Sequence, residues 1–178
     1  MQLINALTEI SQGVDQPIIA IDGPAGSGKT TLADTLSLAL SPQMTTTVIH
    51  MDGLYPGWDD ALGPVLTETL LWLTQSHKEK KDLHYSTFNW ATSEFDPPHT
   101  VASSQLLILE GVGSAQRAIE GQLVTSIWLD LDPLIGFQRV IERDGQSITT
   151  QMQKWLHQQE QHFAIDKTKE RCEFILST

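Results

Sequence analysis

The stretch Gly23-Pro24-Ala25-Gly26-Ser27-Gly28-Lys29-Thr30 decides the fold of this chain. It matches the pattern Gly-x-x-x-x-Gly-Lys-Ser/Thr at every fixed position. Glycines allow a tight turn whose backbone N–H groups surround phosphates, and the helix that follows points its positive end at the same charge. Because glycine makes up about 7% of average sequence, a chance match in a chain of this length has a probability of about 1%. We therefore predict a phosphate-binding loop made by these residues: Gly23, Ala25, Gly26, Ser27, Gly28, Lys29, Thr30 and Thr31.

Two side chains of this loop have chemistry of their own. The Lys29 ammonium can reach the β- and γ-phosphates of a nucleotide, and the Thr30 hydroxyl can bind Mg²⁺. We therefore expect ATP and Mg²⁺ as the ligands, with Lys29 acting in catalysis as well as in binding.

Segments on both sides of the loop alternate between strand and helix patterns. The loop follows an apolar run over 17–22, which is typical of a buried parallel strand, and it precedes a predicted helix over 29–40. The other predicted strands cover 46–51, 106–109, 126–131 and 173–176. Leu3, Ile4, Leu7 and Ile10 recur at helical spacing and predict a short amphipathic helix near the start of the sequence. Three further predicted helices cover 65–75, 133–143 and 148–167. This alternation predicts a three-layer α/β fold with a mostly parallel central sheet, formed by one domain over residues 1–178.

Acidic residues follow two of the predicted strands. Asp52 comes directly after the strand over 46–51, and Glu110 comes directly after the strand over 106–109. The carboxyl ends of parallel strands meet at one edge of the sheet, where such folds bind ligands. One carboxylate there could accept the proton of an attacking hydroxyl, for which we choose Asp52, and Glu110 could hold Mg²⁺ together with Thr30. The alternative is that Asp52 caps a turn and Glu110 is a solvated strand end.

Arginines lie on the predicted helix over 133–143. Arg139 and Arg143 are four residues apart and so share one face, where they can clamp a polyphosphate and stabilise transition-state charge. We expect the segment 139–147 to be a mobile lid, whereas a solvated helix face is the alternative. Arg117 could also reach substrate or phosphate, but a role outside the site is the stronger alternative.

Aromatic residues surround the predicted base in the sequence. Tyr55 and Trp58 follow Asp52, while Phe88 and Trp90 lie in the segment 76–105, which no pattern assigns to a strand or helix. Flat side chains in loops can stack on a substrate ring, but they can also cover a sheet edge. Trp155 falls on the predicted late helix, where core packing is the better explanation.

Composition excludes some partners. The net charge of −11 argues against binding of a nucleic acid polymer, which needs a basic face. The single cysteine, Cys172, cannot form an internal disulfide, which favours a reducing compartment. No stretch approaches the roughly 18 apolar residues of a membrane helix. We therefore expect a cytoplasmic protein with a small-molecule partner and no membrane partner, and we leave a homodimer open.

Taken together, these motifs resemble the uridine kinase, phosphoribulokinase and pantothenate kinase group of P-loop kinases. In that group an Asp-x-Phe-type motif after the second strand carries the general base, and Asp52-Gly53-Leu54-Tyr55-Pro56 looks like it. A Glu-Gly pair after a hydrophobic strand is matched by Glu110-Gly111. An Arg-rich lid helix with an Arg-Asp pair is matched by Arg139, Arg143 and Asp144. The resemblance covers about residues 17–145 and implies the P-loop NTPase fold and ATP-dependent phosphoryl transfer.

The chain departs from this group in the substrate region. Uridine kinases carry a Tyr-Asp or His-Pro-Asp signature there, and the nearest counterpart, Phe88-Asn89-Trp90, has an amide in place of the acid. The uridine kinase lid also carries more arginines, and pantothenate kinases are longer. The reaction class therefore follows from the resemblance, but the identity of the acceptor does not.

Three classes of function remain at this point. The first is a kinase for a small hydroxylated metabolite, with nucleosides such as uridine ahead of pantothenate-like compounds and sugars. The second is a nucleotide-binding regulatory or switch protein with weak NTPase activity, but the chain has no Asn-Lys-x-Asp guanine motif. The third is a non-catalytic phosphate-loop module, against which the intact loop and Asp52 argue. Transfer of a phosphoryl group to an added acceptor separates the first class from the others.

Overall fold

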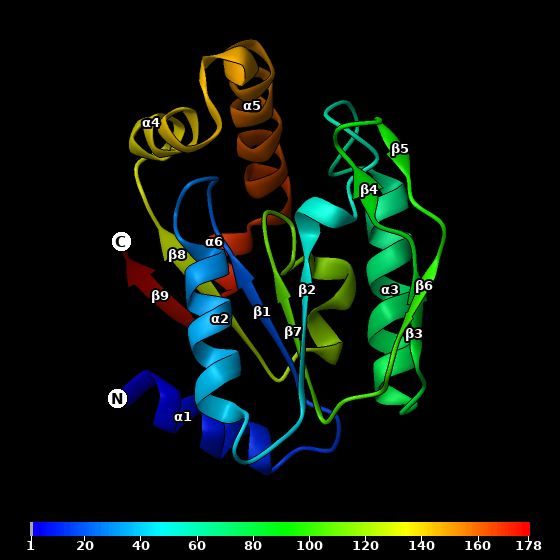
Figure 1. The fold of residues 1–178 in the computed structure, drawn as a ribbon. Coiled ribbons are helices and arrows are strands. Elements are labelled where there is room, and N and C mark those ends of the chain that lie inside the picture. Colours follow the sequence, from blue (N-terminus) through cyan, green and yellow to red (C-terminus); the bar gives the residue numbers. More distant parts are fainter. Residues whose placement is uncertain (1) are drawn as a thin grey trace.

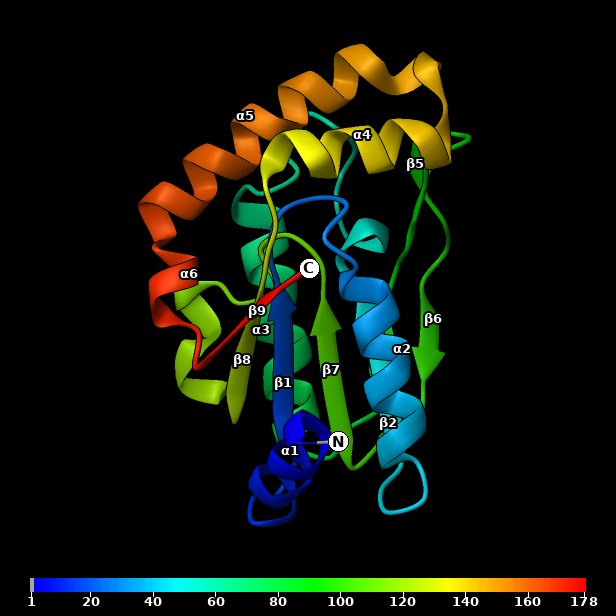
Figure 2. The same ribbon diagram turned by 90° about the vertical axis from the view of Figure 1, so that its left-hand side faces the viewer.

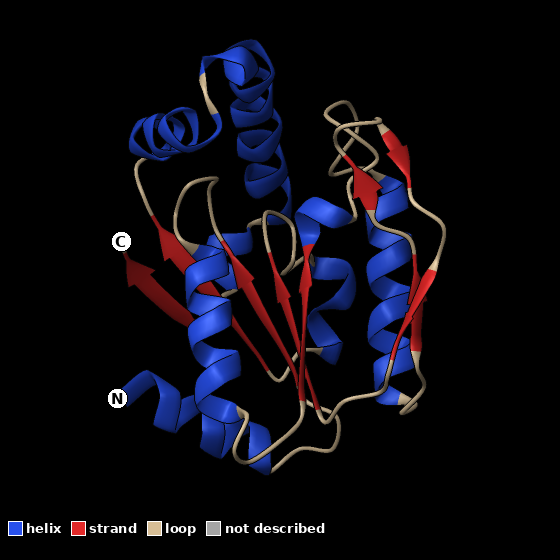
Figure 3. Ribbon diagram, viewed as in Figure 1, coloured by secondary structure: helices blue, strands red, loops and turns tan. Residues whose placement is uncertain are grey.

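A five-stranded parallel sheet forms the centre of the protein, as a computed structural model that describes residues 2–178 shows (Figures 1 and 3). The strands lie in the order β2-β7-β1-β8-β9, and every neighbouring pair is parallel. Their bounds are β1 Ile18–Asp22, β2 Thr46–His50, β7 Leu106–Glu110, β8 Thr125–Asp130 and β9 Phe174–Ser177. The predicted α/β fold with a parallel sheet is thereby confirmed.

Helices cover both faces of this sheet. Successive strand residues point to opposite faces, so Ile19 and Ile21 pack with Leu36 of α2, whereas Ile18 packs with Leu66 of α3. The sheet is therefore the middle one of three layers, with an apolar core on each side. The helices of the two outer layers include α1 Gln2–Gln12, α2 Lys29–Leu40 and α3 Pro64–Lys78, with the 3₁₀ helix η2 Arg117–Gln122 beside α3.

Two helices lie above the carboxyl ends of the strands, where Figure 2 shows them crossing the top of the molecule. They are α4 Pro133–Asp144 and α5 Thr149–Asp166, joined by the short 3₁₀ helix η3 Gln146–Ile148. The side chain of Asp132 caps α4 by accepting the N–H of Leu134 at 2.8 Å. Gly145 ends the helix with φ 93°, and the chain turns there into η3. The predicted helices are thus present, and α4 and α5 lie where ligands bind in such sheets.

The segment that the sequence left unassigned forms two small antiparallel pairs beside α3 (Figure 1). Their strands are β3 Leu83–Tyr85 with β6 His99–Val101, and β4 Phe88–Asn89 with β5 Glu94–Phe95. Strands of two or three residues are too short to produce a recognisable alternation of polar and apolar residues.

Several element ends also differ from the predictions. The helix α3 runs to Lys78, β2 ends at His50 before the 3₁₀ helix η1 Met51–Gly53, and a short helix α6 Thr168–Arg171 follows α5. Among the described residues, no helix has the length and the apolar composition that a membrane crossing requires.

Candidate functional site

The phosphate loop lies between β1 and α2, above the carboxyl edge of the sheet. Gly26 and Gly28 have φ values of 76° and 89°, which residues other than glycine rarely adopt. A Cβ atom on Gly26 would come within 2.4 Å of the backbone oxygen of Gly136, so α4 packs directly on the loop. The loop is therefore enclosed between the sheet edge below and α4 above.

Lys29 lies inside the loop and is only 8% exposed. Its ammonium donates to the backbone oxygens of Gly23 at 2.9 Å and Pro24 at 2.8 Å. Burial lowers the pKa of Lys29, and the nearby Asp22 carboxylate opposes this effect. The lysine is thus a desolvated cation, in surroundings where its attraction for phosphate is stronger than in water.

Thr30 and Glu110 come together as the proposed metal pair. The Thr30 hydroxyl donates to Oε1 of Glu110 at 3.1 Å, and Nδ1 of His50 hydrogen-bonds to the same oxygen. This contact with Glu110 raises the pKa of His50. A hydroxyl beside a carboxylate is the type of oxygen donor set that Mg²⁺ prefers, so these residues fit the ion.

Asp52 is the middle residue of η1, two residues after the end of β2. Its side chain is exposed and lines the cavity described below. Neighbouring protein atoms nevertheless desolvate the carboxylate and raise the pKa of Asp52, and repulsion by Glu110 raises it further. A carboxylate that is harder to ionise than usual binds a proton more readily, which suits a general base.

One cavity of about 590 Å³ joins all these groups. Its charged end contains Lys29, Asp52 and Glu110. Its other end is uncharged and mostly aromatic, with lining residues that include Tyr55, Trp58, Trp90, Val112, Met152 and Trp155. The structure therefore brings most of the predicted site residues into a single space. Those that line it are Ala25, Gly26, Gly28, Lys29, Thr30, Thr31, Asp52, Tyr55, Trp58, Trp90, Glu110, Arg139 and Arg143.

The aromatic end is a packed cluster rather than a set of separate rings. Trp58 lies edge-on to Trp90, with ring centroids 5.0 Å apart, and 6.4 Å from the Trp155 ring. The Trp90 indole N–H donates to the backbone oxygen of Asp52 at 2.9 Å, which ties this wall to the proposed base. The Tyr55 hydroxyl donates to the backbone oxygen of Val112 at 2.8 Å. A ligand on this wall would therefore lie beside Asp52.

Both predicted lid arginines line the cavity. Arg139 donates to the backbone oxygen of Gly26 at 3.3 Å. Arg143 forms an ion pair with Asp144, with 2.6 Å between Nη2 and Oδ2. Arg139 thus contacts the phosphate loop, while Arg143 contacts the last residue of α4.

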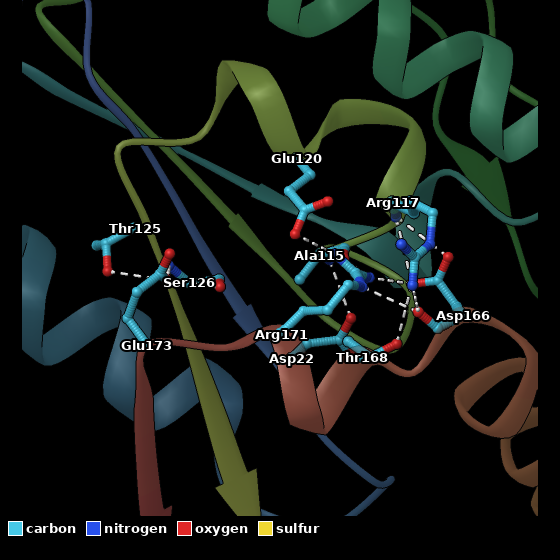
Figure 4. Close-up of polar contacts among 10 residues, drawn as sticks. All are labelled: Asp22, Ala115, Arg117, Glu120, Thr125, Ser126, Asp166, Thr168, Arg171 and Glu173. Carbon is cyan, nitrogen blue, oxygen red and sulfur yellow. Dashed lines mark hydrogen bonds and ion pairs between the residues drawn. The ribbon is translucent and has the colours of Figure 1, made fainter.

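Two predicted substrate residues do not line the cavity. Phe88 packs behind Trp90, with ring centroids 5.0 Å apart, and so supports the aromatic wall from outside. Arg117 lies at the start of η2, where its guanidinium donates to the backbone oxygen of Asp166 at 3.2 Å (Figure 4). Its backbone N–H also binds the Asp166 carboxylate. This arrangement corrects the substrate assignment of Arg117, because the residue holds the end of α5 instead.

Asn89, which stands where uridine kinases have an acid, has a local role. Its side-chain oxygen accepts the N–H groups of Ala91 at 3.1 Å and Thr92 at 3.4 Å. These contacts stabilise the turn between β4 and β5, and an amide makes them without adding charge.

The helix α5 contributes residues that the sequence did not indicate as part of the site. Trp155, expected in the core, contacts the Tyr55 ring with centroids 5.1 Å apart and lines the cavity beside Met152. One turn later, Gln159 accepts the backbone N–H of Ala25 in the phosphate loop at 3.0 Å. Nothing in the sequence separates these residues from other members of a glutamine-rich helix, because only the placement of α5 gives them their role.

Asp22 was also missed, although it had a signal. It ends the otherwise apolar strand β1 and is fully buried. Its carboxylate accepts backbone N–H groups of Gly23, Gly113 and Ala115 at 2.7, 3.1 and 2.9 Å. Burial raises the pKa of Asp22, while these hydrogen bonds act in the opposite direction. The residue ties the start of the phosphate loop to the segment after β7.

Arg171 anchors the far end of α5 to the same segment (Figure 4). It donates to the backbone oxygens of Ala115 at 2.8 Å and Asp166 at 2.9 Å, and it also contacts the Asp166 carboxylate. A further ion pair joins it to Glu120 at 3.3 Å. The C-terminal end of α5 is therefore held firmly, while its other end leads into the proposed lid.

Searches of known proteins found similarity at the level of structure. No protein-family model matches the chain, and no curated protein matches its sequence. A possible uridine kinase from Bacillus stearothermophilus has a similar structure, with a TM-score of 0.69 and 20% sequence identity over 99% of this chain and 100% of that one. A candidate fructose transport system kinase from Silicibacter sp. TM1040 follows, with a TM-score of 0.65 and 20% identity over 98% of both chains.

A third similar structure is that of YFH7 from Saccharomyces cerevisiae, described as a candidate P-loop kinase with a circular permutation. Its TM-score is 0.62, with 11% identity over 99% of this chain and 98% of that one. These likenesses extend over nearly the whole chain. This protein has the fold of the P-loop kinases of the uridine kinase-like group.

Proposed function

We propose that this protein is an ATP- and Mg²⁺-dependent kinase that phosphorylates a hydroxyl group of a small metabolite. One observation carries the proposal: Lys29, the pair Thr30 and Glu110, and Asp52 line one cavity that continues into an uncharged aromatic wall. A phosphate donor site and a distinct acceptor site thus meet at a carboxylate that can accept a proton.

The charges at the inner end match phosphoryl transfer. Asp52 accepts the proton of the acceptor hydroxyl while the hydroxyl oxygen forms a bond to the γ-phosphorus. The bond between the γ-phosphorus and the bridging oxygen of ADP breaks in the same step, and ADP leaves. Lys29 and the arginines of α4 balance the negative charge on the phosphoryl oxygens. Thr30 and Glu110 would hold Mg²⁺, which neutralises charge on the phosphates when bound.

The uncharged end supports a neutral, ring-bearing acceptor. Among residues 2–178, the cations that line the cavity are Lys29, Arg139 and Arg143, which belong to the phosphate loop and α4. An acceptor with its own phosphate or carboxylate would need a further cation on the aromatic wall. Tryptophan faces instead favour stacking on flat, uncharged rings. Nucleosides with a free hydroxyl, such as uridine, are therefore the favoured class.

A substrate panel tests this proposal directly. The protein is incubated with ATP and Mg²⁺ and a nucleoside, vitamin and sugar panel, and ADP formation is followed above the rate without acceptor. A nucleoside monophosphate serves as the matched charged control for each nucleoside. We expect a neutral ring-bearing compound to raise ADP formation and to gain a phosphate. ATP binding without transfer to any acceptor would favour a regulatory nucleotide-binding protein instead.

A further inference from the structure

Gln159 of α5 contacts the phosphate loop. Its side chain is 2% exposed, and its Oε1 accepts the N–H of Ala25 at 3.0 Å. Buried amide groups keep a hydrogen-bond partner because an unpaired one is costly. The contact joins residues 134 positions apart in the chain, so it reflects tertiary packing and no local preference.

The same face of α5 builds the acceptor wall. Met152, Trp155 and Gln159 are the buried residues of this helix, and they follow one another at spacings of three and four. The first two line the cavity, and the third holds the loop. Gln158 next to them donates to the backbone oxygen of Trp58 at 3.1 Å. One rigid helix thus contacts both the aromatic wall and the phosphate loop.

We propose that Gln159 is a positioning residue for nucleotide binding, which sets the conformation of the phosphate loop through the N–H of Ala25. The inference rests on the proposed use of a nucleotide. Ala25 stands one residue before Gly26, where the backbone turns to φ 76°. By occupying the N–H of Ala25, Gln159 orients the following peptide groups toward the phosphates.

The side chain at position 159 must be uncharged for this role. A glutamate at position 159 could still accept the Ala25 N–H, but it would place a negative charge beside the loop that holds phosphates. The repulsion would grow with the charge of the nucleotide. Loss of ATP affinity relative to ADP therefore tests whether position 159 lies close to the phosphates, while a neutral variant without the acceptor oxygen tests the hydrogen bond itself.

The test measures dissociation constants of ADP and a non-hydrolysable ATP analogue with Mg²⁺ and no acceptor. For Gln159→Glu, we expect affinity for the ATP analogue to fall at least tenfold, with a smaller loss for ADP. For Gln159→Met, which removes the acceptor oxygen without adding charge, we expect about a fivefold loss for both nucleotides. Thermal unfolding and circular dichroism check that each variant is folded.

Gln161→Glu is the matched control, since Gln161 is exposed on the same helix and hydrogen-bonds to His157. It should bind both nucleotides within twofold of the unchanged protein. If Gln159→Met binds both nucleotides within twofold of the unchanged protein, the inference is overturned whatever Gln159→Glu does. Binding of both nucleotides by Gln159→Glu within twofold would overturn it as well. If the unchanged protein binds neither nucleotide, the proposed function fails, and the inference falls with it.

Discussion

The two ends of the cavity are built in different ways. The phosphate end consists of a continuous loop and two residues at strand ends, so neighbours in the sheet bring Lys29, Asp52 and Glu110 together. The aromatic end is assembled from Trp58, Trp90 and Trp155, which come from three separate segments. The first end serves chemistry that is common to many phosphate-transferring proteins, whereas the second selects the acceptor. Substitutions should therefore affect catalysis at one end and acceptor binding at the other.

The largest effect is expected for Lys29→Ala. The variant should lose about 10³-fold in kcat/KM, because a desolvated donor to the phosphates is removed. The fold should persist, since the change removes a buried charge rather than creating one. Steady-state kinetics and thermal unfolding are the measurements. The control is Lys80→Ala, which loses only an exposed ion pair with Asp15. Nucleotide affinity and turnover equal to those of the unchanged protein would remove the central claim.

Asp52→Asn should lower kcat by about 10²-fold and leave ATP affinity unchanged, because a general base acts in the chemical step. Asp59→Asn, at an exposed position in the following loop, is the matched control. A loss of less than about tenfold in kcat would exclude Asp52 as the base.

The pH dependence of kcat gives a second measurement on Asp52. Only the ionised carboxylate accepts a proton, so kcat falls as the pH drops through the pKa of Asp52. Desolvation by neighbouring protein atoms and the repulsion by Glu110 raise that pKa, which moves the acid limb to higher pH than for an ordinary aspartate. The limb should be absent from the residual activity of Asp52→Asn. An unchanged limb in that variant would assign it to another group.

Arg143→Ala should lower kcat at least tenfold and raise the ATP KM less, because the residue balances charge on the transferring phosphoryl group. Arg117→Ala is the control, since its guanidinium holds Asp166 outside the cavity, and its kcat should stay within twofold. Hydrogen exchange across 139–147 measures the lid directly. We expect more protection with an ATP analogue and acceptor bound, and equal protection in both states would count against a lid.

The smallest effect is expected at the aromatic end. Trp58→Ala should raise the KM of the acceptor about tenfold while the ATP KM stays unchanged, because stacking area is lost only there. Trp72→Ala, on α3 outside this cavity, is the matched control. A rise in the ATP KM equal to that of the acceptor would show that the two ends do not act separately.

The acceptor region shows where prediction from sequence failed. The short pairs β3 with β6 and β4 with β5 contain strands of two or three residues, which leave no periodic pattern to detect. Arg117 looked suitable for substrate because it follows Glu110 closely, but η2 directs it toward the end of α5. Trp155 looked like a core residue, and its packing on Tyr55 agrees with that, but the same ring also lines the cavity. Apolar spacing on a helix cannot separate a core face from a cavity wall.

Local sequence alone determined the phosphate loop, the strands beside it and the positions of Asp52 and Glu110. Loop geometry depends on glycines next to one another in the chain, and parallel strands necessarily bring their carboxyl ends to one edge. Only the tertiary structure decided that α5 lies across the site, so that Trp155 reaches Trp58 and Gln159 reaches Ala25. Those contacts join segments far apart in the chain, and they depend on how α5 is anchored by Arg171. Long-range packing of this kind leaves no mark in the local pattern of any single segment.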